Sequence, residues 1–153
     1  GNTFINKDKI ALKQSINLSS YNKFLLRGRF LYDGAYYQRA LNELDKIGHE
    51  INFSSNGNTI SEYWYRRARI FQKLKKSNNE IISLFKKSLV STSNISTHFQ
   101  PMSSLQIALI YELENDYANS KVFFDKCLKY KSYDYEKSIR KRAKEGLKRI
   151  SNI

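Results

Sequence analysis

The chain has 153 residues, of which 41% are hydrophobic, 14% aromatic and 27% charged, and its formal net charge at pH 7 is +13. This length suits one domain, and the hydrophobic content excludes an intrinsically disordered polymer. A single cysteine excludes an internal disulfide, and no apolar run reaches the ~20 residues that a membrane-spanning helix needs. The basic excess is typical of proteins that bind nucleic acid or anionic membranes, but a chain rich in Lys, Asn, Ile, Tyr and Ser also fits an AT-rich genome.

The amino-terminal segment, residues 1–19, is the first predicted element. It begins GNTFINKDKI, without an initiator methionine or the apolar core of a signal peptide, so we expect a piece of a longer protein. Within it, KDKIALKQSINL (7–18) has apolar residues at helical spacing, which predicts a short lead-in helix. Neither this start nor the lone cysteine indicates a cellular compartment.

Three helical hairpins are predicted over residues 20–133. The segments FLLRGRFL (24–31), WYRRARIF (64–71) and SLQIALIY (104–111) each have a small residue at their fifth position. These residues, Gly28, Ala68 and Ala108, recur at 40-residue intervals, and a second helical pattern follows each segment. The expected helices, in pairs, cover residues 21–33 and 36–48, 61–75 and 79–91, and 101–114 and 117–130.

Local signals mark several of these helix starts. TISE (59–62) and SNNE (77–80) have the Ser/Thr-x-x-Glu form of a capping box, which predicts that helices begin there. Pro101, the only proline, suits the first turn of the fifth helix, where its missing N–H is harmless.

Gly28 lies inside a helical pattern, where glycine costs about 1 kcal/mol relative to alanine. A helix accepts glycine in such a place when another helix approaches closely. We therefore expect Gly28 to face Ala40 in the second helix of the first hairpin.

Residues 134–153 are predicted to form a basic amphipathic helix, over 134–150, that caps the last hairpin. A solenoid needs such a helix to cover its last apolar surface. The alternative is a helix that binds nucleic acid or lipid through its seven basic residues. Its apolar stripe consists of Ile139, Ala143, Gly146, Leu147 and Ile150.

The repeated pattern resembles the tetratricopeptide repeat, W-x2-L-G-x2-Y followed by A-x3-F and a small residue. It departs from that family at Arg27 and Arg67, where the family has leucine, and in its period of 40 rather than 34 residues. The resemblance implies an all-α superhelix, a solenoid of three hairpins with a capping helix. The matching positions are Phe24, Gly28, Leu31, Ala40, Leu44 and Ile47, then Trp64, Ala68, Phe71, Ile81, Phe85 and Ser88, then Ser104, Ile107, Ala108, Tyr111, Tyr117, Ser120, Phe124 and Cys127.

Longer runs, RGRFLYDGAYYQRAL among them, resemble the carboxyl-terminal part of a group of tetratricopeptide proteins from Bacteroidetes. That resemblance implies further repeats upstream and no catalytic residues. A weaker likeness, in YKSYDYEKSIRKRAKEGL, is to the end of the eukaryotic tetratricopeptide repeat 39 and Iml2 family.

The sequence shows no pattern of residues that is typical of catalysis, of a cofactor or of a metal site. His49 and His98 are predicted to lie in surface loops, with no HExxH, GxSxG or phosphate-loop motif beside them. Cys127 falls at a helix-packing position, which predicts an inert thiol. We therefore expect a protein that is not an enzyme.

The predicted function is a scaffold that binds a peptide or protein in a concave groove. Arg29 and Arg69 are one period apart, and neighbouring guanidinium groups repel unless an anion or carboxylates such as Asp33 and Glu112 pair with them. An acidic peptide is the expected ligand. The groove residues that the resemblance implies include Leu25, Arg29, Tyr32, Tyr65, Arg66, Arg69, Lys73, Gln106 and Leu109.

Two alternatives stay open at this point. The groove arginines can be solvated or paired within the protein. The chain can also be a helical-repeat domain that binds nucleic acid through its basic surface. Three repeats would read few bases, so we expect nucleic-acid binding to be weak and non-specific.

Overall fold

A computed structural model describes residues 21–48, 51, 56–90 and 96–153 of the chain, and this part contains helices and turns but no strand. Residues 21–33 are helical. They are followed by α2 (Tyr37–Asp45), α3 (Gly57–Lys73), α4 (Asn78–Ser88), α5 (Phe99–Leu113), α6 (Tyr117–Lys129) and α7 (Glu136–Ser151). The all-α prediction is confirmed. The lead-in helix predicted before residue 20, and His49, lie outside the described residues.

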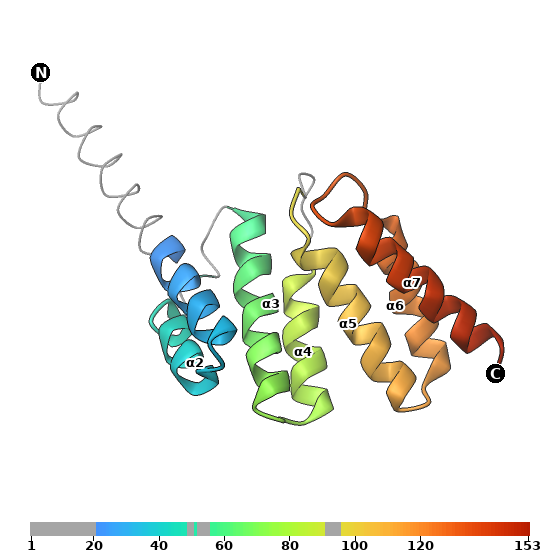
Figure 1. The fold of residues 1–153 in the computed structure, drawn as a ribbon, viewed down its shortest axis with the longest axis horizontal. Helices are drawn as coiled ribbons and strands as arrows, with labels where there is room; N and C mark the ends of the chain where they lie inside the picture. The colour runs from blue at the N-terminus through green and yellow to red at the C-terminus, as the bar shows by residue number, and fades with distance from the viewer. Residues whose placement is uncertain (1–20, 49–50, 52–55, 91–95) are drawn as a thin grey trace, which may run out of the picture.

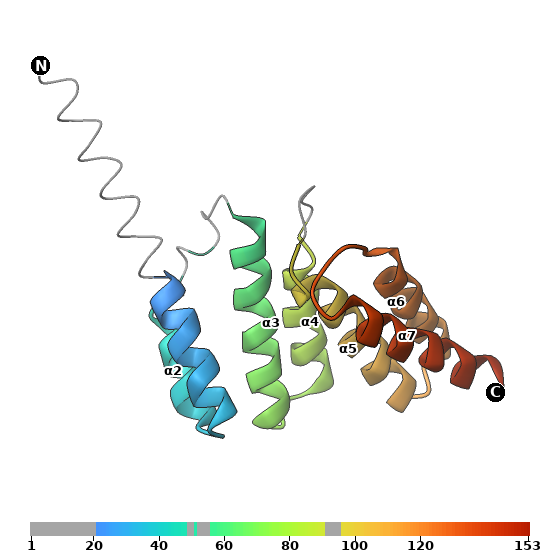
Figure 2. The ribbon, with the colours of Figure 1, turned by 45° about the horizontal axis from the view of Figure 1, so that its top comes forward.

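The helices form hairpins that follow one another along the molecule, from residues 21–33 at one end to α7 at the other (Figures 1 and 2). Two of these hairpins are α3 with α4 and α5 with α6, and α5 also contacts α3 and α4 of the hairpin before it. In the same way α7 contacts α5 and α6. The carboxyl-terminal helix therefore lies where the first helix of a fourth hairpin would lie.

The small residues of the 40-residue pattern lie where helices meet. Ala68 and Ala108 are completely buried. A Cβ atom placed on Gly28 would lie 3.1 Å from Cδ2 of Leu44 and 3.7 Å from the carbonyl oxygen of Ala40. The expected close approach of the first two helices at Gly28 is thus confirmed, with Leu44 as its closest neighbour.

The hydrophobic core consists of three clusters, which follow one another along the row of helices. Since each cluster takes residues from neighbouring hairpins, the hairpins stabilise one another. Representative members are Leu44 and Ile70 in the first, Phe85 and Ile107 in the second, and Phe124 and Ile139 in the third.

The start of α3 differs from its prediction. The helix begins at Gly57, because the side chain of Asn56 accepts hydrogen bonds from the backbone N–H groups of Asn58 (3.0 Å) and Thr59 (3.4 Å). The capping box predicted at 59–62 is therefore wrong. An asparagine earlier in the chain already caps the helix, so Thr59 and Glu62 lie inside it.

The other two predicted starts agree with the structure. Ser77 Oγ accepts a hydrogen bond from the backbone N–H of Glu80 (3.2 Å), and the Ser77 N–H donates to the Glu80 carboxylate (3.1 Å). This is the predicted capping box, and it begins α4. Pro101 is the third residue of α5, within its first turn.

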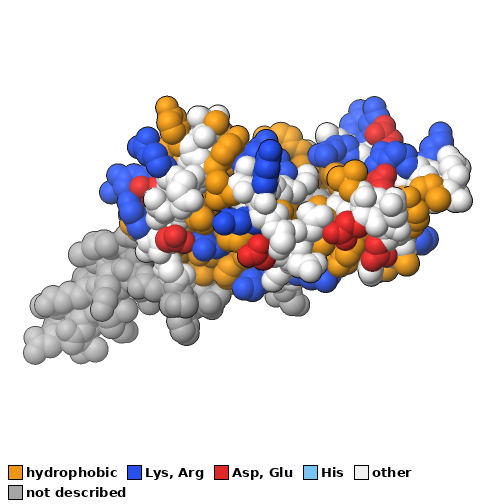
Figure 3. Space-filling model, turned by 90° about the horizontal axis from the view of Figure 1, so that it is seen from below, with side chains coloured by type: hydrophobic (Ala, Val, Ile, Leu, Met, Phe, Trp, Pro, Cys, Tyr) orange, Lys and Arg blue, Asp and Glu red, His pale blue; other side chains and the backbone are white. Residues whose placement is uncertain are grey.

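Charged side chains of both signs are mixed on the face of the molecule drawn in Figure 3, where they alternate with exposed hydrophobic side chains. The basic excess of the chain therefore does not produce a surface of a single sign on that face.

Candidate functional site

A cavity of about 470 Å³ lies between the helix at 21–33, α3, the start of α5 and the loop that precedes α7. Because α5 contacts α3 directly, the start of α5 and the α6–α7 loop come close to the first two hairpins. The side chains that line the cavity include three arginines, three carboxylates and a group of aromatic rings. They are Arg29, Tyr32, Asp33, Glu62, Tyr65, Arg66, Arg69, His98, Phe99, Asp134 and Tyr135.

Five of the nine predicted groove residues line this cavity. The side chains of Arg29, Tyr32, Tyr65, Arg66 and Arg69 come from two hairpins, and the packing of the helix at 21–33 beside α3 brings them together.

The other four predicted groove residues lie elsewhere. Leu25 is only 3% exposed and belongs to the first core cluster, since it lies one turn before Gly28 on the face that packs against Leu44. Lys73 is exposed at the end of α3. Gln106 accepts a hydrogen bond from Gln72 (3.2 Å), and Leu109 packs against the third core cluster, which includes residues of α7. The packing of α7 against α5 explains why Leu109 is not free for a ligand.

Arg66 is paired within the protein. Its Nε donates a hydrogen bond to the Glu62 carboxylate (3.1 Å), and its guanidinium lies 5.5 Å from the ring centroid of Phe99. The Arg66 side chain is only 18% exposed. Arg66 therefore forms part of the cavity wall.

Arg29 and Arg69 have weaker internal partners. Arg29 lies 3.9 Å from the Asp33 carboxylate, and both side chains are more than half exposed. Arg69 donates a hydrogen bond to the neutral side chain of Gln72 (2.7 Å). The charge of Arg69 is thus not paired with a carboxylate in the described part of the chain.

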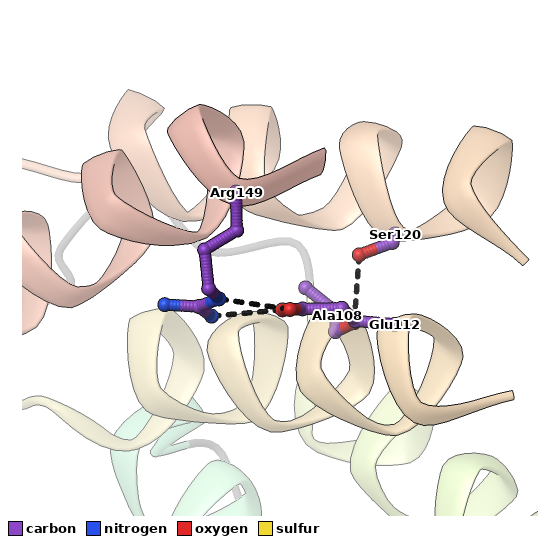
Figure 4. A network of polar contacts seen from close by, with 4 residues as sticks. All are labelled: Ala108, Glu112, Ser120 and Arg149. Carbon is purple, nitrogen blue, oxygen red and sulfur yellow. Dashed lines mark hydrogen bonds and ion pairs between the residues drawn. The ribbon is translucent and has the colours of Figure 1, made fainter. Parts of the chain in front are cut away.

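Glu112, named above as one possible partner of the groove arginines, pairs instead with Arg149 of α7 through two hydrogen bonds of 2.8 Å (Figure 4). The packing of α7 on α5 places Arg149 beside Glu112. The same figure shows the hydroxyl of Ser120, which donates to the carbonyl oxygen of Ala108 (2.9 Å) where α5 meets α6.

The formal charges of the three arginines and three carboxylates around the cavity cancel, but their pairing is uneven. Glu62 is bonded to Arg66, while Arg69 is bonded to a neutral amide. An anion is therefore favoured beside Arg69, whereas Glu62 and Asp134 disfavour one at the other end of the cavity.

Sequence reasoning predicted Tyr32 and Tyr65 for the site but missed the rings of His98, Phe99 and Tyr135. The His98 ring lies 4.5 Å from that of Phe99 and 5.2 Å, edge-on, from that of Tyr135, and the Tyr65 ring lies 5.4 Å from that of Phe99. His98 lies in the connection before α5, as predicted, but it is half-buried in this ring cluster and does not lie freely on the surface. No local signal in the sequence places Tyr135 beside His98, because the two residues come from different hairpin connections.

Burial and a nearby arginine lower the pKa of His98 and so favour its uncharged form. Desolvation is the largest cause that lowers the pKa of the imidazole, and the positive charge of Arg66 adds to it. At the packing position of Cys127, burial raises the pKa of the thiol to about 11. This thiol is therefore a poor nucleophile.

In the described ranges, no group of three or more His, Cys, Asp and Glu side chains is arranged to hold a metal ion. None of the helices described in the structure has both the length and the apolar character to cross a bilayer.

No protein-family model, curated protein or solved structure matches this chain. The resemblance to tetratricopeptide repeats therefore depends on the pattern of residues within each predicted hairpin.

Proposed function

We propose that the chain is a tetratricopeptide-like scaffold that binds an acidic peptide segment in the cavity between the helix at 21–33, α3 and the α6–α7 loop. The observation that carries this proposal is the convergence of Arg29, Arg66 and Arg69 on one cavity that also exposes aromatic rings. Arginine can bind a carboxylate with two parallel hydrogen bonds, and aromatic rings offer apolar contact area.

The arrangement of the helices supports the solenoid part of the proposal. Small residues repeat every 40 positions at helix contacts, and each hairpin packs on the one before it. In such a repeat protein, the first helices of successive hairpins form an extended binding surface. All five predicted residues that line the cavity are on the first helices of their hairpins, at positions 29, 32, 65, 66 and 69.

Binding of nucleic acid is a second candidate, and the net charge of +13 favours it. Several basic side chains are paired with carboxylates, however. Arg67 lies 2.6 Å from Asp45, and Lys121 lies 2.8 Å from Asp125. Because these basic charges are partly neutralised, we favour binding of an acidic peptide over binding of nucleic acid.

The proposal is tested with fluorescein-labelled octapeptides that contain glutamate and phenylalanine, by fluorescence anisotropy at physiological salt. We expect the triple variant Arg29→Ala, Arg66→Ala, Arg69→Ala to bind at least tenfold more weakly than the natural chain. The matched control changes the exposed Lys126, Lys129 and Lys137 to alanine, which removes the same charge outside the cavity.

Equal losses of affinity in the triple variant and in the lysine control would mean non-specific attraction, and would overturn the proposal. So would undiminished binding by a folded triple variant. The helical circular dichroism spectrum verifies that each variant folds.

A further inference from the structure

We infer that Arg69 is the anion-binding residue of the cavity, and that the ligand is an extended segment in which a carboxylate side chain lies two residues from an aromatic one. This inference rests on the proposed function and specifies the ligand of the same site.

Arg69 is oriented by neutral groups and keeps its charge available. Its Nη1 donates to Gln72 Oε1 (2.7 Å), and Gln72 Nε2 in turn donates to Gln106 Oε1 (3.2 Å). This chain of amides, which runs from α3 to α5, holds the guanidinium in place without neutralising it. The remaining N–H donors of Arg69 can bind a ligand carboxylate.

The other two arginines have different roles. Arg66 is hydrogen-bonded to Glu62 and stacked on Phe99, so a ligand carboxylate would have to displace an existing ion pair. Arg29 is more than half exposed and has Asp33 as a loose partner at 3.9 Å. It adds positive charge near Arg69 without a fixed geometry.

An aromatic surface lies one helical turn from Arg69. Tyr65 and Arg69 are four residues apart on α3, so their Cβ atoms are about 5–6 Å apart. Tyr65 lies beside Phe99, which is in contact with His98, and Tyr135 lies edge-on to His98. Tyr135 is 71% exposed, so one edge of this ring cluster is open to a ligand.

The distance between the two parts of the site selects the spacing in the ligand. In an extended peptide, residues two apart point to the same side and lie roughly 6.6 Å apart. Adjacent residues point to opposite sides, and residues four apart lie roughly 13 Å apart. Of these three, the spacing of two is the nearest match to the Cβ separation of Arg69 and Tyr65, with both ligand side chains on one side.

The carboxylates at the aromatic end of the cavity determine in which direction the ligand binds. Glu62 and Asp134 line the cavity near His98, and both act on its pKa. An acidic side chain at that end would be repelled, so an apolar ring is favoured there.

The experiment uses three labelled octapeptides of the same composition, each with one Glu and one Phe among Gly and Ser residues. The Glu and Phe are adjacent, two apart or four apart. We expect the peptide with spacing two to bind at least fivefold more tightly than the others. Equal affinities for the three peptides would overturn the inference.

Single variants distinguish the roles of the three arginines in binding. We expect Arg69→Ala and Arg69→Gln to weaken the binding of the spacing-two peptide at least tenfold and Arg69→Lys to restore part of it, while the control Arg39→Ala on α2 binds normally. Two different negative results can be distinguished. If Arg69→Ala binds normally but the triple arginine variant does not, this inference fails and the proposed function stands. If the triple variant also binds normally, both fail.

A spectroscopic measurement completes the test. In ¹H–¹⁵N spectra of the arginine Nε groups, addition of the spacing-two peptide should shift the Arg69 signal more than the Arg66 signal. A larger shift at Arg66 would overturn the assignment of the anion to Arg69.

Discussion

At the scale of single residues, two helical glycines differ in what surrounds them. A Cβ on Gly28 would lie 3.1 Å from the end of the Leu44 side chain, which can rotate. A Cβ on Gly146 would lie 2.2, 2.5 and 2.7 Å from three ring atoms of Phe124, which is completely buried. Glycine is therefore needed at position 146 for α7 to pack on α6.

Moving the buried Phe124 ring should cost about 1–3 kcal/mol, and alanine returns about 1 kcal/mol of helix propensity. Because the overlap at this ring is severe, we predict that Gly146→Ala lowers the free energy of unfolding by about 2 kcal/mol. Gly28→Ala should change stability less, since Leu44 can adjust. Urea denaturation measures both, with Ser138→Ala on the exposed face of α7 as control. A Gly146→Ala variant as stable as the natural chain would contradict this account.

His98 should make stability depend on pH. Burial and the charges of Arg66 and Arg29 lower its pKa below the ordinary value of 6.5, and Asp134 and Glu62 act in the opposite direction. As the pH falls, the His98 imidazole is therefore protonated at a higher pH in the unfolded chain than in the folded one. The contribution of neutral His98 to the free energy of unfolding is complete above about pH 6.5. It is lost as the pH falls through that value toward the lower pKa of the folded state.

We predict that the free energy of unfolding decreases between pH 7 and pH 5, and that His98→Phe makes the decrease smaller. Phenylalanine keeps the ring contacts with Phe99 and Tyr135 but does not titrate. Denaturation curves at several pH values test this. An unchanged slope in His98→Phe would show that other groups cause the pH dependence.

At the scale of elements, α7 is held by its arginines as well as by its apolar stripe. Ile139, Ala143 and Gly146 are buried, as predicted for the stripe, while Leu147 and Ile150 pack against the third core cluster. Arg140 donates hydrogen bonds to the carbonyl oxygens of Leu128 (2.7 Å) and Tyr130 (3.2 Å). A cation at these carbonyls also stabilises the carboxyl end of α6 through its helix dipole. These contacts favour the capping role over a helix dedicated to nucleic acid.

The pair of Arg149 and Glu112 joins α7 to α5. Its hydrogen bonds to Arg149 are the main reason that the pKa of Glu112 is lowered. We predict that Arg149→Ala raises this pKa toward its ordinary value, which a ¹³C NMR titration measures. Since the Arg149 side chain is half exposed, a double-mutant cycle with Glu112→Gln should give a coupling of at most about 1 kcal/mol. An unchanged Glu112 pKa would show that the pair does not form in solution.

At the scale of the whole molecule, the basic charge is spread over several helices. The face drawn in Figure 3 carries both Lys or Arg and Asp or Glu side chains. Such a surface can attract a polyanion but offers it no single continuous track.

We predict weak, non-specific binding of duplex DNA that decreases steeply with salt, with a log–log slope near −0.9 for each neutralised phosphate. Anisotropy titrations of labelled duplexes at several salt concentrations measure this slope. The lysine control variant should weaken DNA binding as much as the triple arginine variant. Sequence-selective, sub-micromolar binding at physiological salt would favour the nucleic-acid function instead.

Features that depend on residues close in the chain could be predicted from the sequence. The capping box at Ser77 and Glu80, the first-turn Pro101 and the stripe of α7 all follow from local hydrogen bonding or helical spacing. The start of α3 was predicted four residues late, because Asn56 caps the helix in preference to Thr59. Several residues near the start of a helix can serve as its cap, and the structure shows which of them does so.

The sequence by itself determined an all-α chain of repeated hairpins, because the 3.6-residue period and the 40-residue spacing of small residues are present in the order of the amino acids. Only the tertiary structure decided how the candidate site is composed. The packing of α5 on α3 brings His98 and Phe99 to Tyr65, and the loop before α7 adds Tyr135. These contacts join residues far apart in the chain, so they depend on how whole helices pack against one another and not on any local pattern.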